Sequence, residues 1–493
     1  MRKAASTNLN VMLSLPKHLY RVSNSFTTAA KMLRQAQRDV LQFRSIPMRQ
    51  VLLLLLSILP FLTHAQAELA TNNITWTTPS RNAGESMPCG GSDIGLNVWA
   101  ENGDVLFYIA RSGTFDENNS LLKLGRVRLQ LTPNPFEKGT FKQELALQTG
   151  DVTLTGTVGK TTTQVHIWVD VFKPVVHVEI SSSDKLTAEA SYENWRFADH
   201  RTKGKENNQN SYKWAPQGEV KTRHDNISFH NQGVEFFHQN QAQTVFDVTV
   251  QQQGLASIKD QLYNPLSQLI FGGAMQGLNM LPAGTATGQY LNTPYHGWKL
   301  KSRTPARSHS IVVALHTATA TDAKQWQQEM QKTLAVAQQN SKAARQRTVA
   351  WWRDYWQRSF IHIQPDKAAA KAPEWQAGRN YQLMRYMLGC NAFGTSPTKF
   401  NGGLFTYDPV LTDSTLKFTP DFRNWGGGTH TAQNQRLVYW PLLKSGDAAL
   451  MKPQFDFYLR LLKNAELRSQ TYWQHPGACF TEQLENFGLP NPA

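Results

Sequence analysis

The sequence feature that most constrains the fold is a change in the spacing of apolar residues near Asp322. From Thr71 to about Thr319, apolar and polar residues alternate in short runs separated by turn signals such as Asn102-Gly103. One such run is Val245–Val250. Regular runs of this kind predict a large antiparallel β-sandwich.

After Asp322 the pattern becomes helical. Residues 322–348 contain no Gly or Pro and place their apolar side chains near helical spacing, which predicts one long amphipathic helix. It continues into Trp351–Trp356, which holds three tryptophans and a tyrosine. These rings suit either sugar stacking or packing, and packing is commoner at a domain junction. Further helical patterns lie at 374–393, 429–443 and 447–466.

A separate apolar segment lies near the N-terminus. Met48-Arg49-Gln50 precedes about 12 largely apolar residues, too few to span a bilayer, and Ala65-Gln66-Ala67 follows as a cleavage site. This predicts a signal peptide at 48–67 and a secreted or periplasmic protein. Because signal peptides stand at the N-terminus, we expect residues 1–47 to be a mis-called extension, with a structured basic arm as the alternative.

Charge and cysteine content argue against several classes of protein. The formal net charge is +15, but nearly half of the excess lies in residues 1–47, so a nucleic-acid partner is not expected. The three cysteines are far apart and form no CxxC pair, which argues against a thiolate zinc site. We find no P-loop, Rossmann fingerprint or Gly-x-Ser-x-Gly elbow, and expect no cofactor, metal or membrane span.

Three motifs together carry a family resemblance. They are Met-Pro-Cys-Gly-Gly-Ser-Asp-Ile-Gly-Leu at 87–96, the aromatic segment at 351–356, and Trp-Gly-Gly-Gly-Thr-His-Thr-Ala-Gln-Asn-Gln at 425–435 with Tyr-Trp-Pro at 439–441. With these motifs the chain resembles the six-hairpin glycosidases near glycoside hydrolase family 95, over nearly everything after Glu68. It is most similar to secreted bacterial proteins of Bacteroidetes type with an N-terminal β-sandwich of unassigned function.

The resemblance implies a multidomain fold, β then α. An antiparallel β-supersandwich would be followed by a linker helix and an (α/α)6 toroid whose mouth holds the active site. The implied segments are a sandwich over 68–320, a Trp-rich linker helix over 321–360 and a helical glycosidase domain over 361–493. A whole toroid needs roughly 250–350 residues. Since about 130 follow Pro365, we expect a partial, C-terminally truncated toroid.

The resemblance also implies a glycoside hydrolase acting on oligo- or polysaccharide, with inversion. Inversion needs one acid and one group that activates water. In family 95 the water is held by an Asn-x-Asn before Tyr-Trp-Pro; here the second asparagine is Asn434, and Ala432 replaces the first. Asn434 is therefore a candidate catalytic residue, and a helix-surface amide is the alternative.

Glu482, beside Phe480, is the candidate general acid, because an apolar neighbour raises a carboxyl pKa; substrate-binding and structural roles stay open. Further side chains in the same motifs could contact sugar, although each has an ordinary structural alternative. These candidates are His430, Gln433, Asp421, Trp425, Glu485 and Asp93.

Two other functions remain open. A carbohydrate-binding protein without hydrolysis is favoured by Ala432, which offers no side-chain hydrogen bond. A polysaccharide lyase also joins a sandwich to a helical toroid, but would replace the carboxylates with a Tyr/His pair. The expected partner in every case is a carbohydrate, and the oligomeric state is not predicted.

Overall fold

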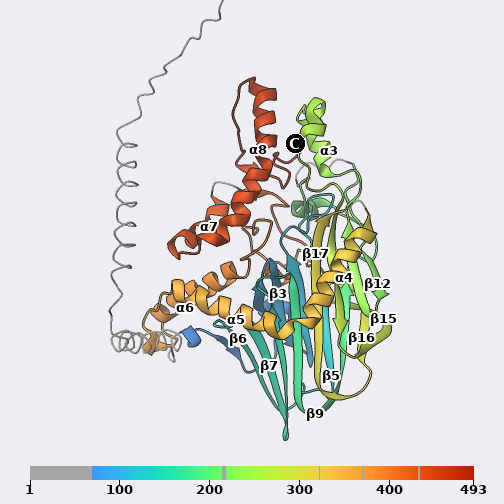
Figure 1. Cartoon of the computed structure of the whole chain (residues 1–493), viewed down its shortest axis with the longest axis vertical. Helices are drawn as coiled ribbons and strands as arrows, with labels where there is room; N and C mark the ends of the chain where they lie inside the picture. Colours follow the sequence, from blue (N-terminus) through green and yellow to red (C-terminus); the bar gives the residue numbers. More distant parts are fainter. Residues whose placement is uncertain (1–68, 214–217, 321, 369–370, 431–432, 493) are drawn as a thin grey trace, which may run out of the picture. The chain divides into compact units, whose positions relative to one another are not determined.

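The computed structural model describes residues 69–213, 218–320, 322–368, 371–430 and 433–492 (Figure 1). The predicted extension at 1–47 and signal peptide at 48–67 lie outside these residues. Within them, the chain forms a large antiparallel β-sheet domain followed by a few helices, as predicted. No helix in the described ranges is long and apolar enough to cross a membrane.

The sheet domain consists of two sets of antiparallel strands that share β9 (Val175–Asn194). The first set is β1 (Ile74–Trp76), β6 (Thr140–Ala146), β7 (Asp151–Val158), β8 (Thr161–Val169), β17 (Ala306–Thr319), β14 (Leu269–Gly277), β13 (Gly233–Gln239) and β12 (Asn226–His230). The second is β2 (Met87–Gly91), β3 (Ile94–Glu101), β4 (Asp104–Arg111), β5 (Arg126–Thr132), β16 (Thr293–Ser302) and β15 (Met280–Tyr290).

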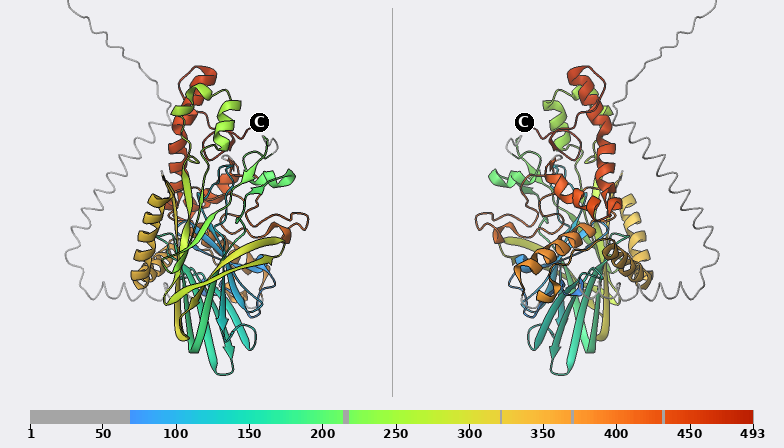
Figure 2. Two further views of the ribbon diagram at one scale, coloured as in Figure 1. Left: turned by 90° about the vertical axis from the view of Figure 1, so that its right-hand side faces the viewer. Right: turned by 90° about the vertical axis from the view of Figure 1, so that its left-hand side faces the viewer.

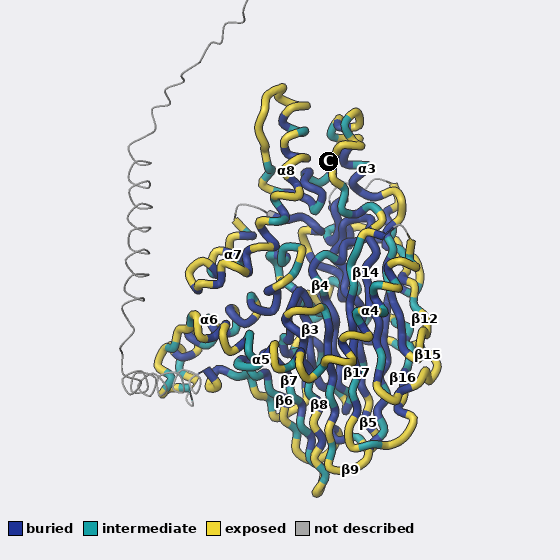
Figure 3. The backbone as a smooth tube through the Cα atoms, in the orientation of Figure 1, coloured by how far each residue is buried: buried dark blue, intermediate teal, exposed yellow. Residues whose placement is uncertain are grey.

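Strand β9 passes from one set to the other. Its first half pairs with β8 and β17, and its second half with β5 and β16. Polar residues 181–185 separate the halves and are mostly exposed, so the strand leaves one sheet and enters the next without burying unpaired polar groups. Apolar residues of both sets bury a common core, which Figure 3 shows as the dark interior of the strands.

The structure confirms the turn predicted at Asn102-Gly103 but not the strand predicted at Val245–Val250. Asn102 and Gly103 both adopt positive φ between β3 and β4, so the hairpin signal is confirmed. The run Val245–Val250 is not a strand but lies in helix α3 (Val245–Gln252). A capping box explains the difference, because Asp247 accepts a hydrogen bond from the Thr244 backbone N–H at 2.8 Å.

Two helices occupy the stretch predicted as one. Helix α4 (Ala323–Gln339) lies on β14 and β17 and buries an apolar stripe that includes Trp326 and Met330. Helix α5 (Ser341–Arg358) begins after Asn340, whose side chain caps α4 by donating to the Val336 carbonyl. The break lets α5 take its own direction, visible in Figure 1.

The aromatic segment within α5 is packing. Trp352, Tyr355 and Trp356 are buried in the sandwich core, and Trp356 Nε1 donates to the Leu147 carbonyl at 2.6 Å. These rings are therefore not available to stack sugars.

The remaining helices are α6 (Pro373–Gly389), α7 (Asn434–Lys444) and α8 (Lys452–Trp473). The end of α6 packs on the β2–β3 hairpin, where a Cβ on Gly90 would lie 2.8 Å from Cys390 Cβ. Helix α7 starts later than predicted, because residues 429–430 form strand β18, which pairs with β19 (Gln483–Leu484). The two views of Figure 2 show α8, in red, beyond one end of the long strands.

Candidate functional site

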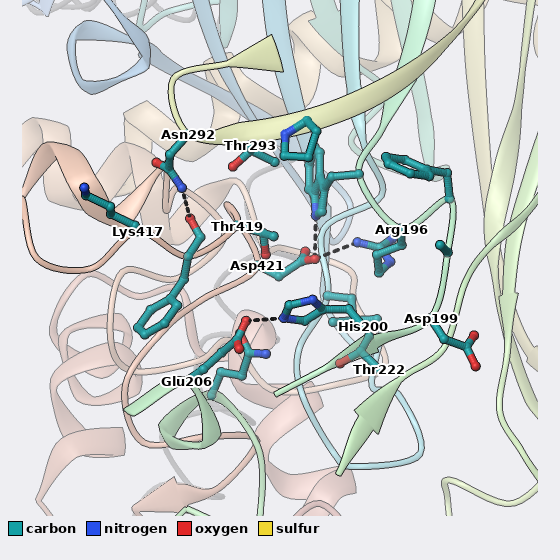
Figure 4. Close-up of a pocket in the computed structure, with 17 residues that line it drawn as sticks. Arg196, Asp199, His200, Glu206, Thr222, Asn292, Thr293, Lys417, Thr419 and Asp421 are labelled. Atoms are coloured by element: carbon teal, nitrogen blue, oxygen red, sulfur yellow. Dashed lines mark hydrogen bonds and ion pairs between the residues drawn. The ribbon is translucent and has the colours of Figure 1, made fainter. Parts of the chain in front are cut away.

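A pocket of about 460 Å³ lies where three segments of the chain meet (Figure 4). One wall comes from the end of β9 and the short strands β10 (His200–Arg201) and β11 (Lys221–Thr222). A second comes from the turn between β15 and β16, and a third from residues 417–421 of the helical half. The pocket therefore needs both the sandwich and the loop that precedes α7.

Aromatic side chains form the apolar part of this pocket. Trp195, Phe197 and Phe418 line it together with Pro294. Phe197 stacks on His296 with ring centres 3.8 Å apart, which fixes its orientation. Flat apolar faces beside polar groups are the usual surface for a sugar ring.

Asp421 closes one side of the pocket and is held by three donors. Its Oδ2 accepts from Trp195 Nε1 at 2.6 Å and from Arg196 Nη1 at 2.8 Å, and its Oδ1 accepts from the Lys123 backbone N–H at 2.7 Å. Asp421 was predicted to contact sugar, and it does line the pocket. Because both of its oxygens are already engaged, its main task here is to anchor the 417–421 segment to the sandwich.

A second carboxylate is paired with a histidine. Glu206, near the start of the short helix η2 (Gly204–Gln209), accepts from His200 Nε2 at 2.8 Å. This hydrogen bond raises the pKa of His200. His200 is held opposite Thr222 by the pairing of β10 with β11. The polar stretch 201–210, which resembles an ordinary surface loop in the sequence, thus supplies part of the pocket.

Several pocket oxygens have no hydrogen-bond partner among the described residues. They are Thr222 Oγ1, Thr293 Oγ1, Asn292 Oδ1 and Gln209 Oε1. The orientation of the Asn292 amide follows from its Nδ2, which donates to the Phe418 carbonyl at 3.3 Å, so the oxygen is the atom left over. Buried oxygens of this kind are normally satisfied, so these four are unsatisfied hydrogen-bonding groups in the pocket wall.

Behind the pocket, Arg196 connects to a buried chain of charges. Arg196 also pairs with Asp225 at 2.7 Å, and Asp225 accepts from His238 Nδ1 at 3.0 Å. His238 Nε2 in turn lies 3.1 Å from Glu117. Although burial alone would lower the pKa of His238, Asp225 and Glu117 raise it to about 10. The imidazolium therefore stays charged and holds Asp225 and Arg196 in place.

The residues predicted for catalysis lie on neighbouring segments. Pairing of β18 with β19 sets His430 opposite Gln483, so the short strand before Asn434 lies beside the short strand after Glu482. Asn434 is the first residue of α7 and is half-buried, whereas Gln433 and Glu482 are exposed. Ala432 lies outside the described residues.

Glu485 lies in a fully buried polar cluster beside this strand pair. It forms an ion pair with Lys213 at 2.7 Å and accepts from Ser211 at 2.6 Å and Asn119 at 2.8 Å. Although burial favours the neutral acid, Lys213 keeps the pKa of Glu485 below its usual value. A Cβ on Gly428 would lie 2.5 Å from Gln483 Nε2, so the glycine turn lets the backbone approach this cluster.

Asp93 and Trp425 lie away from the pocket lining. Asp93 is buried and pairs with Arg111 at 3.0 Å, and burial raises its pKa. Trp425 is 45% exposed. The tryptophan that contacts Asp421 is Trp195, which donates the hydrogen bond described above. In the described part of the chain, no group of three or more His, Cys, Asp or Glu side chains is arranged to hold a metal ion.

The pocket residues that sequence reasoning missed come from distant parts of the sandwich. In the sequence, several strands lie between Thr222 and Asn292, so no short motif contains Trp195, His200 and Asn292 together. The sequence signal that could have pointed to this pocket is the polar, glycine-containing stretch at 201–210, which supplies Glu206 and Gln209 to its lining.

Comparison with known proteins gives a family and two distant structural likenesses. The family described as "Domain of unknown function (DUF5703)" matches residues 75–361. A protein from the human microbiome described as a kojibiose phosphorylase matches with a TM-score of 0.47 and 12% identity, over 85% of this chain and 52% of that one. A bacterial glucoamylase complexed with acarbose matches with a TM-score of 0.40 and 9% identity, over 85% of this chain and 56% of that one.

The chain thus spans about half the length of these two solved structures, which are distantly similar carbohydrate-active enzymes. No curated protein matches the sequence.

Proposed function

The chain belongs to the DUF5703 family, and we propose that it is a carbohydrate-active protein that binds a neutral saccharide in the pocket beside Asp421. The observation that carries the proposal is the set of buried, unpartnered oxygens on Thr222, Thr293 and Asn292. The Asn292 amide oxygen can only accept a hydrogen bond, so the group of the ligand that meets it must donate one. Sugar hydroxyls do so, and the rings of Trp195 and Phe418 offer faces for the sugar carbons.

Three carboxylates that line the pocket are each paired with a cation, which suits an uncharged sugar. Asp421 is paired with Arg196, Glu206 with His200, and Asp199 with Arg223. A carboxylate or phosphate placed against the Asn292 amide oxygen would face an acceptor that has no hydrogen to donate, which costs binding free energy.

Calorimetric titration with neutral oligosaccharides and with uronic-acid oligomers tests this proposal. Thr293→Val keeps the side-chain volume and removes a hydroxyl that has no hydrogen-bond partner among the described residues, so folding should be unaffected. We expect it to weaken saccharide binding about tenfold. Thr287→Val, on the exposed side of β15, is the matched control. Equal affinity in both variants, or preference for the uronic-acid oligomers, would contradict the proposal.

Hydrolysis is the second candidate function, supported by the β18–β19 pairing that sets the Asn434 and Glu482 segments side by side. In this proposal the chain is a secreted glycoside hydrolase, with Glu482 protonating the leaving oxygen and Asn434 holding the attacking water with inversion. His430, Gln433 and Trp425 stay proposed substrate contacts on the strength of the sequence resemblance. Glu485 and Asp93, which are buried in ion pairs with Lys213 and Arg111, are instead assigned structural roles.

Product analysis separates the possible reactions. NMR of the released sugar reports the anomer first formed, and an unsaturated product would instead identify a lyase. Asn434→Ala should lower the hydrolytic rate by about 10²-fold, the scale of a lost acid–base contact. Saccharide binding without any product would assign the protein to the non-catalytic class.

A further inference from the structure

A second pocket, of about 390 Å³, lies between the start of β9 and the helix break at Asn340. Its floor is the start of β9, and its walls are the end of α4 and the start of α5. Since α4 ends at Gln339 and α5 turns away, the two helices leave a hollow against this part of the sheet. The pocket shares no lining residue with the one beside Asp421.

A buried imidazole forms part of the floor. His177 is 2% exposed and stacks on Trp168, its cross-strand neighbour on β8, with ring centres 3.9 Å apart and planes within 8°. Its Nε2 has no hydrogen-bond partner in the described part of the chain. Burial lowers the pKa of His177 to about 4, so the ring is neutral at pH 7 and can carry a proton on Nε2.

Three cationic side chains stand around the opening. Lys173 comes from the β8–β9 turn, Lys332 from α4 and Arg347 from α5, and all three are exposed. None of them forms an ion pair within 4.0 Å of another described residue. The carboxylate that faces them is Asp170, whose pKa is raised by burial. Cations therefore outnumber acids at this opening.

The wall between the cations and the imidazole is apolar. Val175, Ala337 and Ala344 are buried there, and Val336 extends the wall to the surface. An inorganic ion would leave these side chains without a contact. A ligand with an anionic end and a small apolar body would cover the wall, meet the cations and reach His177.

We propose that the pocket between β9 and the α4–α5 break binds a small organic anion, a carboxylate or a phosphate ester. Its charged group lies between Lys332 and Arg347, its body packs on Val175 and Ala337, and one of its oxygens accepts a hydrogen bond from His177 Nε2. The inference does not rest on the saccharide proposal, because it uses different residues and a charged ligand in place of a neutral one.

Calorimetric titration with benzoate and with phenyl phosphate tests the site. Benzyl alcohol is the uncharged control, and inorganic phosphate is the anion that lacks an apolar group. We expect benzoate or phenyl phosphate to bind, benzyl alcohol and inorganic phosphate to bind more weakly, and affinity for the anion to fall as salt screens the exposed cations. Tighter binding of benzoate would indicate a carboxylate ligand, and tighter binding of phenyl phosphate would indicate a phosphate ester.

Variants localise the binding. The double variant Lys332→Ala/Arg347→Ala removes two exposed cations and should weaken anion binding about tenfold, whereas Lys342→Ala, an exposed lysine of α5 outside the pocket, should not. His177→Gln should weaken binding without changing its salt dependence. Absence of binding up to about 10 mM, or equal binding by the double variant and the control, would overturn the proposal.

Discussion

Asp421 accepts a hydrogen bond from Arg196 at 2.8 Å, and both side chains are buried. This contact ties the loop before α7 to the end of β9, 225 positions earlier in the sequence. Because Arg196 is also fixed by Asp225, the position of the loop, and with it one wall of the pocket, depends on a charge pair inside the sandwich.

Removing the charge of Asp421 should destabilise the protein. Asp421→Asn leaves Arg196 paired with Asp225 alone and removes a buried charge-assisted hydrogen bond, which is worth about 1.5–3 kcal/mol. Denaturant unfolding measures the loss. Asp413→Asn, which changes an exposed carboxylate just before the 417–421 segment, should alter stability by less than about 0.5 kcal/mol. Similar unfolding free energies for the two variants would contradict a structural role for Asp421.

The buried His238 should make stability depend on alkaline pH. Its pKa is raised to about 10 in the folded protein, against about 6.5 in an unfolded chain. A raised pKa contributes stability that is fully present below about pH 6.5 and is lost as pH rises through about 10. We expect the unfolding free energy to decline over this window, and to decline less in His238→Gln. Parallel curves for the two proteins would rule out this contribution.

Glu485 and Glu482 should respond differently to the same substitution. Glu485→Gln leaves the buried Lys213 without its ion pair and should lower the unfolding free energy by about 3–5 kcal/mol. Glu482→Gln changes an exposed side chain and should leave stability within about 0.5 kcal/mol. If Glu482 is the general acid, its variant should lose hydrolysis while remaining folded, so stability and rate measured on both variants separate the two roles.

The proposed signal peptide predicts where the mature protein begins. Cleavage after Ala67 leaves Glu68 as the first residue, which N-terminal sequencing of protein recovered from the native host would detect. A protein that retains residues 48–67 would not have been exported by this route.

Much of the fold could be predicted because it depends on local patterns. The Asn102-Gly103 hairpin follows from two residues that tolerate positive φ, and the aromatic residues of α5 pack as expected at a junction. Val245–Val250 was misassigned because the capping contact of Thr244 with Asp247 outweighs the alternating pattern. The helix break at Asn340 depends on which surfaces α4 and α5 cover, which local spacing does not contain.

The sequence by itself determined the β-then-α order and the candidate motifs, because periodicity and motif spacing are properties of neighbouring residues. The tertiary structure decided which polar groups are already engaged. Asp421 and Glu485 look like ligands in the sequence, yet both are held by buried partners, Arg196 and Lys213, that lie more than 200 positions away. The unpartnered oxygens of Thr222 and Thr293 carry no sequence signal, because whether a hydroxyl is satisfied depends on what the fold packs against it.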